Sequence, residues 1–161
     1  METVTVGIMM GSESDASVMN EAAKILKNFG VTCEMKVLSA HRTPKECCAY
    51  AENFSKQGGK VLICGAGLSA ALPGVVAAHT LLPVIGVPLD AGSLQGMDAL
   101  LSVTQMPPGV PVGGVAIGKP GAKNAALLAL RILALSDEGI LEKLNEFSEE
   151  QRKKILSIEL N

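Results

Sequence analysis

The chain is 161 residues long, with 48% hydrophobic and 19% charged residues and a net charge of −2, which fits one domain that needs no disulfide or structural metal. Four aromatic residues and no excess of positive charge offer neither a stacking surface nor a basic field, so we expect no nucleic-acid binding. Because there is no apolar run of about 18 residues and no leader sequence, we also expect a cytoplasmic protein that does not bind membranes.

Short apolar runs alternate with segments of helical period along the chain. We predict strands near residues 3–9, 32–38, 59–64, 83–87 and 112–117. The helices between them are predicted near residues 14–29, 43–57, 72–80, 94–104 and 121–135. Gly30 is placed to end the first helix, and Pro44 suits the first turn of the second. This order predicts an α/β, flavodoxin-like three-layer sandwich, in which helices cover both faces of a five-stranded parallel sheet.

A helical tail follows the predicted core. We interpret residues 1–161 as a single domain with its core in about 1–135, and we expect helix starts at Ser136-Asp137 and again at Ser148. The tail, residues 136–161, has apolar residues at helical spacing but no strand to cover. We expect it to pack on a neighbouring subunit; the alternative is that it folds back on its own domain.

The high apolar content also predicts a homo-oligomer, because a monomer of this size does not usually hide so much apolar surface. The four cysteines are Cys33, Cys47, Cys48 and Cys64. They have no C-x-x-C or Cys/His ligand spacing, so we expect reduced packing residues and no metal site.

Two polar turns at the ends of the first two strands carry the candidate chemistry. Gly11-Ser12-Glu13-Ser14-Asp15 offers hydroxyls and helix amides for a phosphate and a carboxylate for ribose hydroxyls. Ser39-Ala40-His41-Arg42-Thr43-Pro44 places an imidazole that titrates near neutral pH beside a guanidinium suited to phosphate. The alternative is that Ser14 and Thr43 are ordinary helix N-caps and His41 is a loop residue.

Two further turns and one histidine leave alternatives open. The small-residue run Gly65–Gly74 could hold a carboxylate or carbon dioxide; it also fits a G-x-G-x-x-A dinucleotide pattern, with Asp90 downstream to meet a ribose. The proline-rich segment Gln105–Gly114 is either a wall of the pocket or a plain connector. We expect a structural or surface role for His79, because no hydroxyl, carboxylate or second histidine is spaced to work with it.

With these residues in view, the chain resembles the N5-carboxyaminoimidazole ribonucleotide mutases of purine biosynthesis, in the phosphoribosylaminoimidazole carboxylase family. The matching stretches include Gly11-Ser12-x-Ser14-Asp15, Ser39–Pro44, Leu72-Pro73-Gly74, Leu82–Pro88, Met106–Val112, Ala116–Lys119 and Gly121–Ala129. The resemblance implies a flavodoxin-like fold, a homo-octamer and no cofactor or metal. It also implies conversion of N5-carboxyaminoimidazole ribonucleotide to 4-carboxyaminoimidazole ribonucleotide, by decarboxylation and recarboxylation at C4.

The same resemblance assigns roles to individual residues. His41 matches the histidine that moves the C4 proton as general acid and base. The substrate-binding positions that match are Ser12, Ser14 and Arg42 for phosphate, Asp15 for ribose, and Ser39, Ala66, Gly67 and Leu68 around the carboxylate or carbon dioxide.

One position departs from the resemblance. Ala71 stands where the mutases usually carry histidine, and the run Leu68–Leu72 lies between the mutase pattern and that of carboxylases that use free carbon dioxide. Direct carboxylation of aminoimidazole ribonucleotide is therefore an alternative to the mutase reaction. An alternative of another class is a non-catalytic sensor of nucleotide phosphates, for which the two polar turns would suffice.

Overall fold

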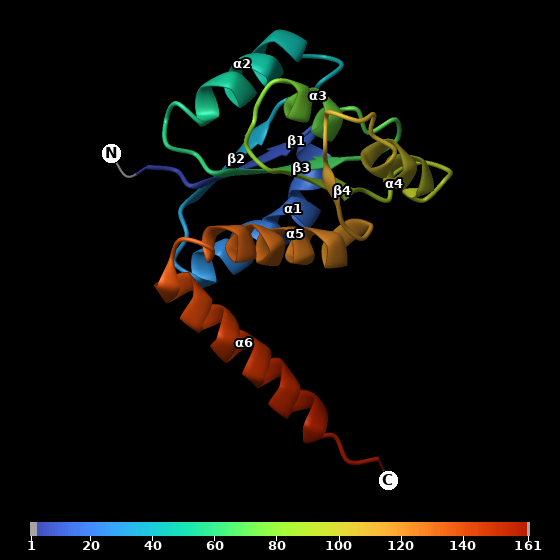
Figure 1. Cartoon of the computed structure of the whole chain (residues 1–161). Coiled ribbons are helices and arrows are strands. Elements are labelled where there is room, and N and C mark those ends of the chain that lie inside the picture. Colours follow the sequence, from blue (N-terminus) through green and yellow to red (C-terminus); the bar gives the residue numbers. More distant parts are fainter. Residues whose placement is uncertain (1–2, 161) are drawn as a thin grey trace. The chain divides into compact units, whose positions relative to one another are not determined.

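The computed structural model describes residues 3–160, which form two compact units, one up to Ala129 and one from Leu130 onward (Figure 1). The first unit contains a five-stranded sheet built from β1 (Val6–Met10), β2 (Cys33–Val37), β3 (Val61–Ala66), β4 (Val84–Pro88) and β5 (Gly113–Gly114). All neighbouring strands are parallel, in the order β2-β1-β3-β4-β5. This is the predicted flavodoxin-like arrangement, and it is confirmed.

Helices cover both faces of the sheet. They are η1 (Glu13–Asp15), α1 (Ala16–Asn28), α2 (Pro44–Phe54), α3 (Leu72–Ala78), α4 (Met97–Thr104) and the first turns of α5 (Gly118–Leu133). Side chains of α2, α3 and α4 share one buried cluster with the sheet, including Phe54, Leu62 and Val103. Figure 1 shows α1 on the opposite face, where Lys123 of α5 pairs with Glu21 of α1 at 3.6 Å. The middle strands are therefore buried on both sides, as continuous apolar runs require.

The predicted end of the first helix and the predicted start of the second are also confirmed. Gly30 follows α1 with φ +77°, its N–H donates to the Lys27 carbonyl at 2.9 Å, and the Val31 N–H donates to the Leu26 carbonyl at 2.9 Å. These two bonds form the glycine-dependent C-terminal motif that ends many helices. Pro44 is the first residue of α2, where its missing N–H costs no hydrogen bond.

Several predicted elements differ in extent, among them the following three. The fifth strand, expected over 112–117, is reduced to Gly113–Gly114 at the sheet edge. The fourth helix begins at Met97 rather than near 94, because Gln95 and Gly96 adopt left-handed backbone angles. The fifth helix begins at Gly118, three residues before the predicted start, because the first turn of a helix accepts a proline such as Pro120.

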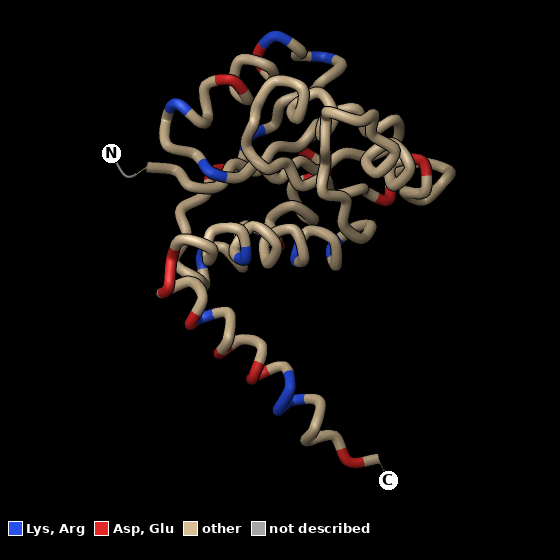
Figure 2. The backbone as a smooth tube through the Cα atoms, viewed as in Figure 1, with Lys and Arg blue, Asp and Glu red and all other residues tan. Residues whose placement is uncertain are grey.

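The second unit contains the end of α5 and α6 (Glu138–Leu156). The predicted start of α6 is confirmed, since the Ile140 N–H donates to the Asp137 side chain at 3.1 Å. The second start at Ser148 is wrong: Ser148 lies inside the continuous helix, and no glycine or proline separates it from the preceding turns. Acidic Glu138 lies in the first turn and Lys153 in the last, a distribution visible in Figure 2 that suits the helix dipole. Across residues 3–160, no helix is both long and apolar enough to cross a membrane.

Candidate active site

A pocket of about 580 Å³ lies where the carboxyl ends of the strands meet, the usual ligand position in such sheets. It is formed by the turns that follow β1, β2 and β3, with Ala91 contributed by the segment after β4. The structure brings all nine predicted site residues together in its lining: Ser12, Ser14, Asp15, Ser39, His41, Arg42, Ala66, Gly67 and Leu68.

The turn after β1 forms a hydrogen-bonded cluster of its own. Ser12 is the N-cap of η1, and its backbone N–H donates to Asp15 Oδ2 at 3.1 Å. The Ser14 hydroxyl donates to Ser12 Oγ at 3.0 Å. The capping residue is thus Ser12 and not Ser14, and both hydroxyls already point toward one another at the pocket.

Among residues 3–160, Asp15 is the one acidic side chain that lines this pocket. Burial raises the pKa of its carboxyl above the ordinary value. Hydrogen bonds from Ser12 and Ser14 and the positive charge of Arg42 act in the opposite direction and limit this rise. A half-buried carboxylate held in this way can accept hydrogen bonds from ligand hydroxyls.

Arg42 connects the first two turns. One of its terminal nitrogens, Nη2, donates to the backbone carbonyl of Gly11 at 2.6 Å, and its backbone N–H donates to Ser39 Oγ at 3.2 Å. These contacts fix the guanidinium at the pocket while several of its five N–H donors stay available. A fixed guanidinium of this kind suits two oxygens of one phosphate.

Thr43 holds the turn after β2 closed. Its hydroxyl donates to the Ser39 carbonyl at 3.1 Å and accepts the Ser39 N–H at 2.9 Å, while the Thr43 N–H donates to the same carbonyl at 2.9 Å. Thr43 therefore occupies the N-cap position of α2 without capping it through its side chain. This role was not predicted from the sequence, although a hydroxyl four residues after Ser39 was a usable signal.

His41 sits at the tip of this closed turn. The side chain is exposed and lines the pocket. Within residues 3–160 its ring makes no hydrogen bond, so both ring nitrogens can face a ligand. An imidazole next to Arg42 and opposite a loop of small residues can move a proton to or from a bound anion.

The turn after β3 brings backbone close to the ligand space. A Cβ at Gly67 would lie 2.8 Å from Cβ of Ala91, so only glycine allows these two loops to approach. Ala91 was missed by the sequence analysis, although it too follows the end of a strand. Asp90 does not line the pocket, and α3 is only seven residues long with proline in its first turn, so the dinucleotide interpretation gains no support.

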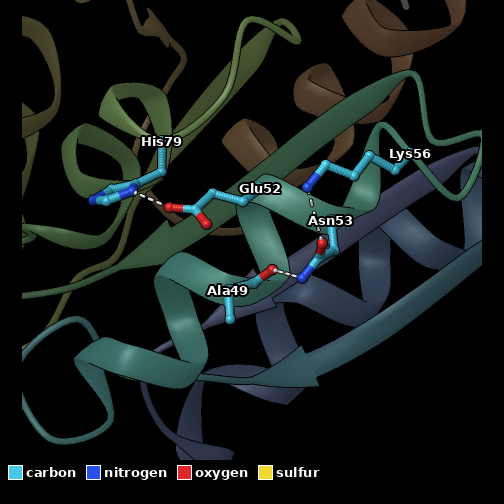
Figure 3. A network of polar contacts seen from close by, with 5 residues as sticks. All are labelled: Ala49, Glu52, Asn53, Lys56 and His79. Atoms are coloured by element: carbon cyan, nitrogen blue, oxygen red, sulfur yellow. Dashed lines mark hydrogen bonds and ion pairs between the residues drawn. The ribbon is translucent and has the colours of Figure 1, made fainter.

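His79 lies elsewhere and has a partner that the sequence did not predict. Its Nδ1 is 2.9 Å from Oε1 of Glu52 in α2, as Figure 3 shows, so the expectation that no carboxylate accompanies His79 is wrong. The two residues are 27 positions apart, a separation that sequence spacing does not reveal. Both are partly exposed, and the pair joins α2 to the end of α3.

The proline-rich segment does not line the pocket described above. Gly109 and Val110 lie instead beside the His79–Glu52 pair, in a separate pocket. Met106 lies near Gly74, where an added Cβ would be 3.2 Å from the Met106 side chain. Within this chain the segment is a connector rather than a wall of the site.

The cysteines and acidic residues give no metal site in the part of the chain that the structure describes. No group of three or more His, Cys, Asp or Glu residues is placed to hold a metal ion among residues 3–160. Cys47 and Cys64 are buried and not disulfide-bonded. Burial raises the pKa of Cys47 to about 11 and raises that of Cys64 as well, so both thiols keep their protons near neutral pH.

Comparison with known proteins identifies similar chains. The family described as AIR carboxylase matches residues 5–154. An N5-carboxyaminoimidazole ribonucleotide mutase of Pyrococcus abyssi is 55% identical over 92% of this chain and 84% of its own, and one of Saccharolobus solfataricus is 52% identical over 96% and 97%. The crystal structure of Treponema denticola PurE covers 94% of each chain with a TM-score of 0.86 and 33% sequence identity.

Proposed function

The chain belongs to the AIR carboxylase family and is an isomerase of the mutase kind, and on that basis we propose that it converts N5-carboxyaminoimidazole ribonucleotide to 4-carboxyaminoimidazole ribonucleotide in purine biosynthesis. One observation carries the proposal: His41, Arg42 and the small-residue loop line the same pocket. Membership in a family of enzymes leaves no support for the non-catalytic phosphate sensor.

The polar turns would bind the ribonucleotide part of the substrate. Arg42 binds the phosphate, together with the hydroxyls of Ser12 and Ser14, which exchange their mutual hydrogen bond for one to phosphate oxygen. Asp15 accepts hydrogen bonds from ribose hydroxyls. The aminoimidazole ring then extends toward His41 and the loop after β3.

The chemistry then takes place between His41 and that loop. The carbamate N–C bond breaks, carbon dioxide is released and the nitrogen takes up a proton. C4 of the ring attacks the carbon dioxide, which lies in a niche formed by Ser39, Ala66, Gly67 and Leu68. His41 removes the C4 proton, which balances the proton taken up by the nitrogen. An imidazole suits both steps because its ordinary pKa lies near neutral pH.

The assembly and location follow the same proposal. We propose a cytoplasmic homo-octamer in which the apolar residues of the tail, 136–161, pack on a neighbouring subunit. Light scattering coupled to size-exclusion chromatography tests this arrangement, with a chain truncated after residue 135 as the comparison. An octamer that persists unchanged without the tail would contradict the role given to it.

Ala71 favours a test of the second candidate, direct carboxylation of aminoimidazole ribonucleotide. Ala71 lines the pocket without a hydrogen-bonding side chain, at the position where the resembling mutases usually carry histidine. Purified protein is assayed with the carbamate substrate and, separately, with aminoimidazole ribonucleotide at saturating bicarbonate. Turnover of the carbamate alone supports the mutase, whereas equal rates on both would overturn it.

His41→Asn tests the proton step directly. Asparagine keeps polarity and much of the size of histidine but cannot act as a base near neutral pH, so we expect kcat to fall by about 10²- to 10⁴-fold. Unchanged kcat would show that another group carries the proton.

A further inference from the structure

Two residues of the loop after β3 have backbone conformations that residues other than glycine rarely adopt. Leu68 has φ +54° and Ala70 has φ +35°, and both line the pocket. Left-handed conformations of this kind are strained for residues with a Cβ, and residues held in them cluster at functional sites. The backbone at position 68 is therefore strained with leucine there, whereas glycine would adopt the same conformation without strain.

The Leu68 side chain has a defined seat. A Cβ added to Gly92 would lie 2.6 Å from Leu68 Cδ2, so the leucine occupies the space that any other residue at position 92 would fill. Gly92 itself has φ +72° and directly follows Ala91, which lines the pocket. Leu68 is 54% exposed, so about half of its surface is covered by neighbouring groups while it lines the open pocket.

The two loops interlock at a second point. Gly67, the neighbour of Leu68, lacks the Cβ that would lie 2.8 Å from Ala91. Each loop thus contributes one glycine to the contact between them: Leu68 of the first loop lies against Gly92, and Ala91 of the second lies against Gly67. These two close approaches bring the loop that carries Leu68 against the loop after β4, beside the small-residue niche.

We propose that Leu68, seated on Gly92, closes the carbon dioxide niche and so determines how much released gas is recaptured at C4. This inference rests on the proposed mutase function. Carbon dioxide is small, uncharged and held by no strong contact, so an apolar wall retains it by blocking its exit. If the gas escapes, the carbamate carbon is lost, the nitrogen keeps its proton, and aminoimidazole ribonucleotide leaves as a by-product. Retention therefore sets the ratio of product to by-product.

The experiment follows the carbon atom. The carbamate carbon of the substrate is labelled with ¹³C and excess unlabelled bicarbonate is added. Mass spectrometry then measures both the fraction of product carrying the label and the amount of aminoimidazole ribonucleotide formed, after subtraction of an enzyme-free control. The variants are Leu68→Ala, which removes the wall, and Leu68→Met, which keeps an apolar side chain of similar size. Leu94→Ala is the matched control, because Leu94 is an exposed leucine of the neighbouring loop that does not line the pocket.

For Leu68→Ala we expect the by-product formed per molecule of product to rise about tenfold, because loss of confinement removes much of the proximity advantage. Leu68→Met and Leu94→Ala should retain the label as the wild type does. Label retention by Leu68→Ala equal to that of the wild type would overturn the inference.

A second series tests the seat on Gly92. Gly92→Ala should displace Leu68 and lower label retention. In the Leu68→Ala background the same change should have little further effect, because the side chain it displaces is gone. Backbone strain at position 92 is common to both backgrounds and cancels in this double-mutant cycle. Additive losses of retention would overturn the proposed seat.

The wild-type result separates this inference from the proposed function. If the wild type forms no product from the carbamate, the proposed function fails and the inference fails with it. If the wild type forms product from the carbamate with its label fully exchanged, retention in a closed niche is refuted, and the separate assay with aminoimidazole ribonucleotide and bicarbonate then decides between the mutase and direct carboxylation.

Discussion

Replacing Thr43 with valine should remove the clamp that holds the His41 turn while keeping the shape of the side chain. Two hydrogen bonds to Ser39 are lost, one at 3.1 Å and one at 2.9 Å. Such bonds contribute about 1 kcal/mol each, and the Ser39 N–H loses its partner. Because these groups are only partly buried, we expect the free energy of unfolding to fall by about 1–2 kcal/mol.

The effect on catalysis should exceed the effect on substrate binding. A looser turn misplaces His41, and a misplacement of about 1 Å can cost about 100-fold in rate. Arg42 stays tied to the Gly11 carbonyl, so its phosphate contact is less affected. We therefore expect kcat to drop about 10- to 100-fold with a smaller change in KM.

Steady-state kinetics with the carbamate substrate and urea denaturation measure the two effects separately. Thr43→Ser is the control, because serine keeps the hydroxyl and should behave nearly as the wild type. A valine variant with wild-type kcat would refute the positioning role, even if its stability falls.

Three further predictions concern binding, packing and pH. Arg42→Ala should raise KM about tenfold or more, because a charge-assisted hydrogen bond contributes about 1.5–3 kcal/mol; an unchanged KM in steady-state kinetics would remove Arg42 from the phosphate site. Gly121→Ala should lower the midpoint of thermal unfolding, because its Cβ would overlap the backbone carbonyl of Ala116, whereas Gly11→Ala, with no atom within 4 Å of its Cβ, should leave it nearly unchanged. Cys47 should resist iodoacetamide in the native protein at pH 8, as measured by mass spectrometry. Because the unfolded thiol ionises near its ordinary pKa of 9.0 and the folded one only near about 11, this residue should also lower the free energy of unfolding as pH rises between those values, and a Cys47→Ala variant should lose that part of the pH dependence.

The sheet and the location of the site were predictable because local patterns determine both. Strands such as β3 are buried at every position, and such strands are visible in sequence as unbroken apolar runs. Parallel strands also place all their following turns at one edge of the sheet, so unusual turns after the first three strands had to meet. The nine residues named from sequence share one pocket for this reason.

What the sequence did not predict depends on distance in space or on competition between signals. Arg42 meets Gly11 across 31 positions and His79 meets Glu52 across 27, and no spacing rule indicates either contact. Ser148 has the pattern of a helix start, but the surrounding residues favour continued helix, so the local signal was overridden. The position of Leu68 against Gly92 depends on the positive φ angles of these two residues, which the sequence pattern does not reveal.

The contact between Arg42 and the Gly11 carbonyl couples ligand occupancy to the outermost strand of the sheet. In the part of the chain that the structure describes, β2 has a neighbouring strand on one side only. Just beyond β2, at the start of the turn that carries Arg42, the Leu38 N–H donates to the Met10 carbonyl at 2.8 Å. If β2 separated from β1, the guanidinium of Arg42 would move away from the pocket. A ligand bound to Arg42 must therefore stabilise the paired strand, because ligand binding and strand opening are thermodynamically linked. Amide hydrogen exchange at Leu38 would then slow when phosphate binds, and the edge of the sheet would report on a site it does not line.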